Sequence, residues 1–455
     1  MALTGTEFAD ALKIYYLDPL NDQVYRATVM LDMLEKNSED VEGSHAYVPL
    51  ITARNPGVGS RKDTATSGPK LPTAGNQTYD AATFKMALHY GRASISGPVM
   101  RQSKTNRGAF TKALDVEMKG LMERLPEDLN RQIWAFGNGR AATISTTVGA
   151  TSTQVEVYSS SVFNLKIGDR VAAADVSDGT IIGTSAVVTN IERDMTIAGV
   201  ASTTLHRVTL GATIGAAFTT GDDTLYFAGG VSGSTPTSED ISRAQEMYGI
   251  PSLVDDGAMG ADEDLATAAL EMLDGSLSMG NIDRTAAGNA IIRSTVLQNP
   301  DGAGTLRPVT TALLEQGFLS CSVKGGAKED SLIGITNAGL WTTIGLLSVG
   351  DRRLNDYKAT LPGGWRAIEF NGRPVTYDRD CPRHVFWWLH MKDLMLLTQS
   401  GYELMDEDGK VLHRLSDRDA YEFTLYRDVQ LAARRFNTHC KIDDLQAVNN
   451  VEADV

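Results

Sequence analysis

The stretch TNRGAFTKALDVEMKGLMERLPEDLNRQIWAFGNGR, residues 105–140, decides the fold. Apolar residues recur in it every three or four positions, the spacing that places side chains on one face of an α-helix. They are Phe110, Leu114, Met118, Leu121, Leu125, Leu129 and Ile133. The pattern predicts a long helix from Thr105 to Phe136, and the GNG of residues 137–139 predicts its end, because glycine readily closes a helix.

A proline stands inside this predicted helix. Pro126 lacks a backbone N–H and clashes with the preceding turn, so we expect it to kink or restart the helix. Glu127 and Asp128 follow it directly, and acidic residues suit a new helix N-terminus.

Before the helix lies a long polar loop. Residues 53–78 are rich in Gly, Pro, Ser and Thr and have little to bury. Extended segments flank the loop at His45 to Ile51 and at Phe84 to Tyr90, where Phe84, Met86, Leu88 and Tyr90 alternate with Lys85, Ala87 and His89. We therefore expect a two-stranded ribbon with a basic tip. Because such a ribbon is marginal in water, it needs a neighbouring surface.

After the helix the composition changes twice. Residues 141–230 are dominated by Thr, Ser, Val, Ala and Gly and predict a small all-β module, with strands at Gln154 to Tyr158, Arg170 to Ala174, Ser185 to Ile191 and His206 to Leu210. From 240 onward helix-like and strand-like stretches alternate, and the last 60 residues are strand-rich. The expected fold class is therefore α+β.

Composition limits the possible functions. The 57 acidic residues outnumber the 42 basic ones, giving a net charge of −15, which argues against a nucleic-acid-binding surface and suits a container wall. The three cysteines show no CxxC spacing, which favours a reduced setting. No signal peptide and no apolar run long enough for a membrane span are recognised.

The search for chemistry is mostly negative. Asp406, Asp408 and Gly409 resemble a calcium loop but lack oxygen ligands at the first and twelfth positions. The set Cys381, His384, His439 and Cys440 lacks the usual zinc spacing. His89 and His390 lie in strand-like stretches, where a surface or satisfied core histidine is expected. We therefore predict no catalytic, cofactor-binding or metal site, and no enzymatic activity.

Several segments, together with their order, resemble the major capsid proteins of tailed bacteriophages, whose fold is shared with herpesvirus capsid proteins and encapsulins. These segments are LPEDLNRQIWAFGNGR (125–140), AQEMYGIPSLVDDG (244–257), NIDRTAAGNAIIRSTVLQN (281–299), FNGRPVTYDRDCP (370–382) and YELMDEDGKVLHRLSDRDAYEFTLYRDVQLAARR (402–435).

The resemblance implies a tailed-phage major-capsid fold with an inserted all-β module. The implied parts are an N-terminal arm (1–45), an extended loop (46–104), the spine helix of a peripheral domain (105–140), the insertion (141–230), a mainly axial domain (231–380), peripheral strands (381–436) and a C-terminal return to the axial domain (437–455).

The resemblance also implies a function and partners. Hexamers and pentamers of the chain would form an icosahedral shell around double-stranded DNA, assembled in the bacterial host cytoplasm and retained in the virion. A portal protein and, as a further partner, a decoration protein would join it. A separate scaffolding protein is expected, because the arm leaves no room before the loop for a long scaffolding extension. An encapsulin-like nanocompartment and a carbohydrate-active enzyme with a β binding module remain alternatives.

We expect the basic loop of one subunit to contact the acidic helix of the next. The predicted inter-subunit contacts are Arg54, Arg61, Lys62 and Lys70 on the loop, and Glu117, Glu123, Glu127 and Asp128 on the helix.

Overall fold

The computed structural model describes residues 28–38, 41–61, 71–103, 107–145, 148–158, 165–175, 179–192, 196–197, 200–201, 205–217, 223–229, 233–256, 280, 282, 284, 286–300, 306–326, 331–347, 359–360, 366–399, 401–405, 412–415 and 417–447. The chain divides into two compact units, each assembled from three segments. The first comprises Met1–Met33, Met86–Met247 and Thr398–Gln430, and the second comprises Leu34–Lys85, Tyr248–Leu397 and Leu431–Val455.

The long helix of the first unit is α4 (Arg107–Trp134), which follows α3 (Gly97–Ser103). The predicted helix is confirmed. Of the two effects expected at Pro126, the restart is wrong, because α4 runs through this residue, and the kink stays a prediction. Proline removes a single backbone hydrogen bond there. Burial of Leu125, Leu129 and Ile133 around it holds the continuous helix together.

The glycines after α4 close the helix as predicted. Gly137 and Gly139 both have positive φ, at 92° and 76°. A residue that follows the β module stabilises this turn. The Ser242 hydroxyl donates a hydrogen bond to the Gly139 carbonyl oxygen at 2.6 Å. A Cβ on Gly139 would overlap the Ser242 backbone, so only glycine fits.

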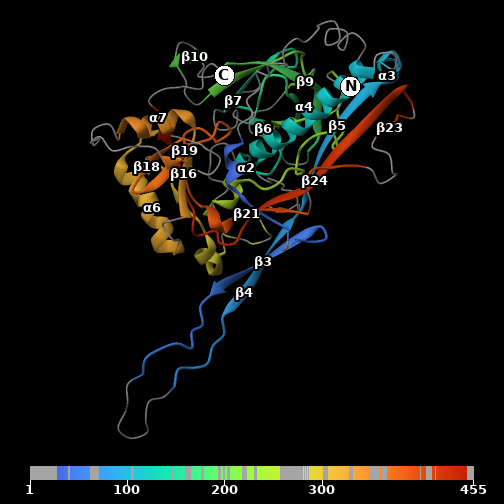
Figure 1. Ribbon diagram of the computed structural model, residues 1–455. Coiled ribbons are helices and arrows are strands. Elements are labelled where there is room, and N and C mark those ends of the chain that lie inside the picture. The colour runs from blue at the N-terminus through green and yellow to red at the C-terminus, as the bar shows by residue number, and fades with distance from the viewer. Residues whose placement is uncertain are drawn as a thin grey trace. The chain divides into compact units, whose positions relative to one another are not determined.

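A long antiparallel pair lies beside α4. Strand β5 (Ala87–Ser96) pairs with β24 (Ala420–Ala433) from Ala87↔Val429 to Ser96↔Ala420, and the two run side by side in Figure 1. The short strands β22 (Glu403–Leu404) and β23 (His413–Arg414) also pair with β24. The helix α2 (Val29–Met33) packs on α4, and the Leu31 N–H donates to Asn130.

The β strands that follow α4 form a barrel. Their order is β6-β13-β8-β9-β12-β7, and the Ile144↔Val157 bridge beside β6 and β7 closes the sheet. The strands are β6 (Arg140–Thr143), β7 (Gln154–Tyr158), β8 (Arg170–Asp175), β9 (Ile181–Glu192), β12 (Leu205–Leu210) and β13 (Asp223–Phe227). Buried valines, alanines, leucines and isoleucines fill the interior. The four strands predicted here are confirmed. A small hairpin, β10 (Thr196–Ile197) and β11 (Val200–Ala201), lies outside the barrel sheet.

The second unit contains a mixed seven-stranded sheet. Its order is β14 (Thr295–Leu297), β25 (Cys440–Ile442), β20 (Phe386–His390), β16 (Leu332–Thr336), β19 (Arg373–Tyr377), β18 (Arg366–Phe370) and β17 (Ala359–Thr360). Helices α6 (Thr311–Gly325) and α7 (Ala338–Leu347) pack on it. Every residue of β20 is buried, and residues 381–397 lie in this unit. The peripheral strands expected over 381–436 stay a prediction.

The same unit holds the smaller elements. Its short helices are α5 (Ile250–Leu253), η3 (Ala287–Ile292) and η6 (Met391–Asp393). Its parallel strand pairs are β1 (Glu35–Asn37) with β21 (Leu394–Thr398), and β15 (Arg307–Pro308) with β26 (Leu445–Gln446). Strand β2 (Val41–Glu42) joins the ribbon described below. Among the described helices, none is long and apolar enough to cross a membrane.

The closing turn of α4 gives a direct stability test. Gly139→Ala should lower the free energy of unfolding by about 1–3 kcal/mol, because alanine is strained at positive φ and meets the Ser242 backbone. Gly120→Ala, on the exposed side of the same helix with open space around it, should raise stability by about 0.5–1 kcal/mol. Urea unfolding midpoints would show the contrast, and equal midpoints for the two variants would contradict the turn's role.

Candidate functional site

A two-stranded ribbon in the second unit corresponds to the predicted basic loop. Strands β3 (His45–Ala53) and β4 (Thr78–Lys85) pair antiparallel, with Ala46 opposite Phe84 and Ile51 opposite Tyr79. One face of the ribbon is buried within the unit, and Phe84 meets Tyr248 edge-on with ring centroids 6.1 Å apart. The buried face consists of Ala46, Val48, Leu50, Ala82 and Phe84.

The predicted alternation beyond Phe84 is wrong. β4 ends at Lys85 and β5 begins at Ala87, and the buried positions then shift by one residue, so Leu88 and Tyr90 are exposed while Ala87 and His89 are buried. The cause is the break at Met86, where the chain leaves one sheet for another. A one-residue shift reverses every side chain of a strand.

The second face of the ribbon is also apolar, and in this chain it is exposed. Tyr47, Ile51 and Tyr79 are 54%, 54% and 66% exposed, and Pro49 and Ala81 lie between them on the same face. We call these five residues the outer stripe. An exposed apolar surface of this kind is typical of sites that bind another protein.

The ribbon continues toward its tip. Figure 1 shows residues 54–61 and 71–77 running side by side beyond the strands, and Pro56 packs against Gly75. Arg54 and Arg61 are exposed there. Lys62 and Lys70 lie outside the described residues, so their predicted contacts stay predictions.

The four predicted acidic partners on α4 differ in their surroundings. Glu117 and Glu123 are partly exposed, and Glu123 lies 3.8 Å from Lys119. Glu127 is buried and accepts a hydrogen bond from Lys166 Nζ at 2.7 Å, and Asp128 accepts from Arg131, His89 and Gln132. The geometry favours Glu117 and Glu123 over Glu127 and Asp128 as partners of a neighbouring loop.

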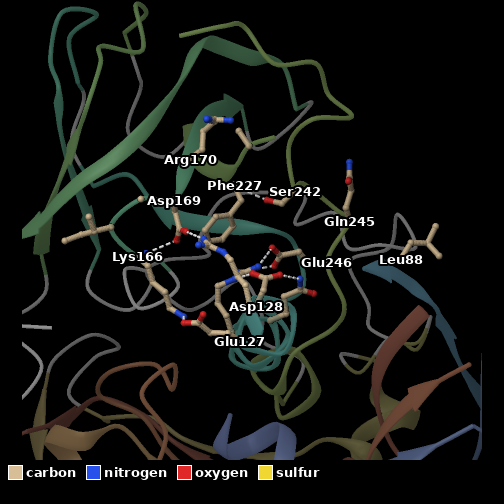
Figure 2. Close-up of a pocket in the computed structure, with 16 residues that line it drawn as sticks. Leu88, Glu127, Asp128, Lys166, Asp169, Arg170, Phe227, Ser242, Gln245 and Glu246 are labelled. Carbon is tan, nitrogen blue, oxygen red and sulfur yellow. Dashed lines mark hydrogen bonds and ion pairs between the residues drawn. The ribbon is translucent and has the colours of Figure 1, made fainter. Parts of the chain in front are cut away.

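Arg131 is the centre of a buried charge network that the sequence did not reveal. Its guanidinium donates to Glu246 at 2.6 and 3.3 Å and to Asp128 at 2.8 Å, and it stacks 4.2 Å above the Phe227 ring. Figure 2 labels Asp128, Glu246 and Phe227, the three residues that these contacts of Arg131 join. Burial works to lower the pKa of Arg131, but the carboxylates of Asp128 and Glu246 outweigh it and raise the pKa. Arg131 therefore remains charged.

His89 extends the network to the β5–β24 pair. Its Nε2 lies 3.1 Å from Asp128 and its Nδ1 lies 3.1 Å from the Tyr402 hydroxyl. Burial raises the pKa of Tyr402 to about 12, and Arg427 lies over its ring at 5.2 Å. The prediction of a satisfied core histidine is confirmed for His89, whose contacts connect α4 to β5.

A cleft of about 460 Å³ opens beside this network, between α4 and the barrel loop at 165–170. Figure 2 shows its lining side chains, among which Leu88 and Ile167 are exposed apolar residues. The Arg124–Asp169 pair, at 3.1 Å, and the Lys166–Glu127 pair also line it. These opposite charges balance one another within the chain, so the cleft resembles a packing surface more than a substrate site.

The residues considered for a zinc site are Cys381, His384, His439 and Cys440, all of which are described. Among the described residues, no group of three or more His, Cys, Asp or Glu side chains could hold a metal ion. His384 bonds to the Leu445 carbonyl, and His439 accepts from the His390 N–H. The calcium-like residues Asp406, Asp408 and Gly409 lie outside the described part of the chain.

His390 and His439 belong to a buried polar cluster in the second unit. His390 lies 2.8 Å from Asp393, which also accepts hydrogen bonds from Arg435 and Thr438. Burial lowers the pKa of His439 to about 4, so this ring is neutral at pH 7. The cluster joins η6 to the turn before β25.

Comparison with known proteins gives structural matches alone. No family model matches the sequence, and no curated protein matches it. The capsid asymmetric unit of cyanophage A-1(L) matches with a TM-score of 0.54 at 14% identity, covering 97% of this chain and 98% of that one. The chain has the tailed-phage major-capsid fold.

Two further capsid structures align over nearly the whole chain, at TM-scores too low to add to this assignment. The capsid of Myoviridae phage XM1 gives 0.44 at 7% identity, covering 96% of this chain and 98% of that one. The capsid of a native GTA particle gives 0.42 at 11% identity, covering 96% and 99%.

The buried network predicts unequal costs for two arginines of α4. Arg131→Ala should destabilise the protein by about 3–5 kcal/mol, because Glu246 would remain buried without its partner. Arg124→Ala removes an exposed member of a surface pair and should cost about 0–1 kcal/mol. Denaturant unfolding of both variants would measure the difference, and similar small losses would show that the network is dispensable.

Proposed function

We propose that this chain is the coat subunit of a tailed phage, self-assembling into an icosahedral shell around double-stranded DNA. The outer stripe is the observation that carries the proposal, since it is an apolar surface that stays exposed in the described part of the chain. The capsid fold over nearly the whole chain supports the same function.

The proposed contact places the ribbon of one subunit on α4 of the next. Apolar burial contributes about 25 cal/mol per Å², so covering Tyr47, Ile51 and Tyr79 would supply most of the adhesion. Each surface ion pair adds only about 0–1 kcal/mol. The charges of Arg54 and Arg61 against Glu117 and Glu123 would therefore set register and partner choice.

This contact joins two different surfaces, a ribbon on one copy and a helix on the next. Heterologous contacts of this kind close into rings when the rotation between copies allows it. Hexameric and pentameric rings are the closed forms that we propose, and together they would build the shell. The barrel over residues 140–227 would lie as an insertion on this shell.

The remaining partners follow from the same proposal. A separate scaffolding protein would guide assembly in the bacterial host cytoplasm, and a portal protein and a decoration protein would complete the virion capsid. The net charge of −15 would keep packed DNA mobile against the wall, because an acidic surface repels phosphates.

Removing the outer stripe tests the proposal. The double variant Tyr47→Ser with Ile51→Ser should keep its fold, because both side chains are about half exposed, but should sediment as single subunits. Wild-type protein and the control Thr83→Ser, a smaller change on the same ribbon, should sediment as rings or shells. Sedimentation velocity measures this. Unchanged large assemblies from the double variant would refute the role of the ribbon.

A further inference from the structure

Helix α6 lies unusually close to the chain that leads into β25. Gly317, Cys321 and Gly325 are spaced four residues apart and therefore share one face of α6. A Cβ on Gly317 would lie 2.8 Å from Ile442 Cδ1, and a Cβ on Gly325 would lie 2.6 Å from the Cα of Thr438. Two glycines, one turn on either side of Cys321, thus allow the helix backbone to rest on residues 437–442.

This packing places Cys321 opposite Cys440. Gly317 lies against Ile442, and Gly325 lies against Thr438. Cys440 lies between Thr438 and Ile442 in the sequence, as Cys321 lies between the two glycines in α6. Both thiols are fully buried in one apolar core, close enough for each to shift the pKa of the other. Cys321 Sγ donates to the Gly317 carbonyl oxygen at 3.4 Å, and Cys440 Sγ donates to the Lys441 carbonyl oxygen at 3.6 Å. Neither is in a disulfide. Two cysteines far apart in the sequence therefore form a dithiol.

We propose that Cys321 and Cys440 form a modification site, which a small two-electron oxidant such as hydrogen peroxide converts into an intrachain disulfide. The disulfide requires Cα atoms about 4.4–6.8 Å apart. A helix that rests on a strand through glycines provides this kind of close approach. The inference does not depend on the proposed coat function.

The chemistry requires one peroxide for each dithiol. The Cys440 thiolate attacks one peroxide oxygen, the O–O bond breaks, and the departing hydroxide takes up a proton to become water. The Cys321 sulfur then attacks the sulfenic sulfur of Cys440, the S–O bond breaks, and the leaving hydroxide combines with the Cys321 proton as a second water. Two thiols are oxidised by two electrons while the peroxide is reduced.

The surroundings favour Cys440 as the first sulfur to react. The neighbouring Cys321 thiol and the Lys324 ammonium, one turn along α6, lower the pKa of the Cys440 thiol and outweigh burial, which acts to raise it. The thiolate is the reactive form of cysteine. Lys324 itself is held by the Ser294 carbonyl at 2.9 Å.

The test is a thiol count and a peptide map of the folded, full-length protein. After treatment with hydrogen peroxide, the denatured protein should show one titratable thiol instead of three, and dithiothreitol should restore all three. Mass spectrometry of a non-reducing digest should contain the peptide that links Cys321 to Cys440. The oxidised protein should also melt several degrees higher, because a long loop is closed.

Two serine variants show whether the third cysteine, Cys381, takes part in the disulfide. Cys381→Ser should still lose two thiols and give the linked peptide, whereas Cys321→Ser should give no linked peptide and no rise in melting temperature. The map of the wild-type protein decides the matter even if a variant folds poorly. Persistence of three thiols, a sulfinic acid without the linked peptide, or a bond to Cys381 or between chains would overturn the proposal.

Discussion

The buried ion pair between Arg131 and Glu246 is the constraint around which the first unit is built. The last turns of α4 are surrounded by protein, so a guanidinium there is tolerated only with carboxylates beside it. Asp128 supplies the second carboxylate, and it also contacts His89 of β5, which pairs with β24. Polar contacts, in addition to an apolar face, therefore hold α4 against the β5–β24 pair and against the segment after the barrel that carries Glu246.

The ribbon of the second unit differs from this network, because part of its surface stays exposed in the described part of the chain. Its inner face is satisfied within the chain, while its outer stripe is left to solvent. A monomer gains nothing from such a surface, but a subunit of a larger assembly does, because the same stripe becomes buried when a neighbour arrives. The fold and this exposed surface together support the shell that we propose.

Local patterns in the sequence predicted the helix, its glycine end, the ribbon and the barrel strands, because each depends on residues close together in the chain. Contacts between distant residues could not be predicted in this way. Arg131 and Glu246 are 115 positions apart, Glu127 accepts a hydrogen bond from Lys166, and Cys440 lies beside Cys321. The prediction of buried and exposed side chains failed after Met86 for a related reason. Which alternate residues of a strand are buried depends on the sheet that the strand joins.

Negative-stain electron microscopy of the purified chain, expressed alone and together with its candidate scaffolding protein, tests the central claim most directly. The account predicts closed shells, or rings of five and six subunits that become shells when the scaffold is present. Single subunits or small oligomers under both conditions would contradict it.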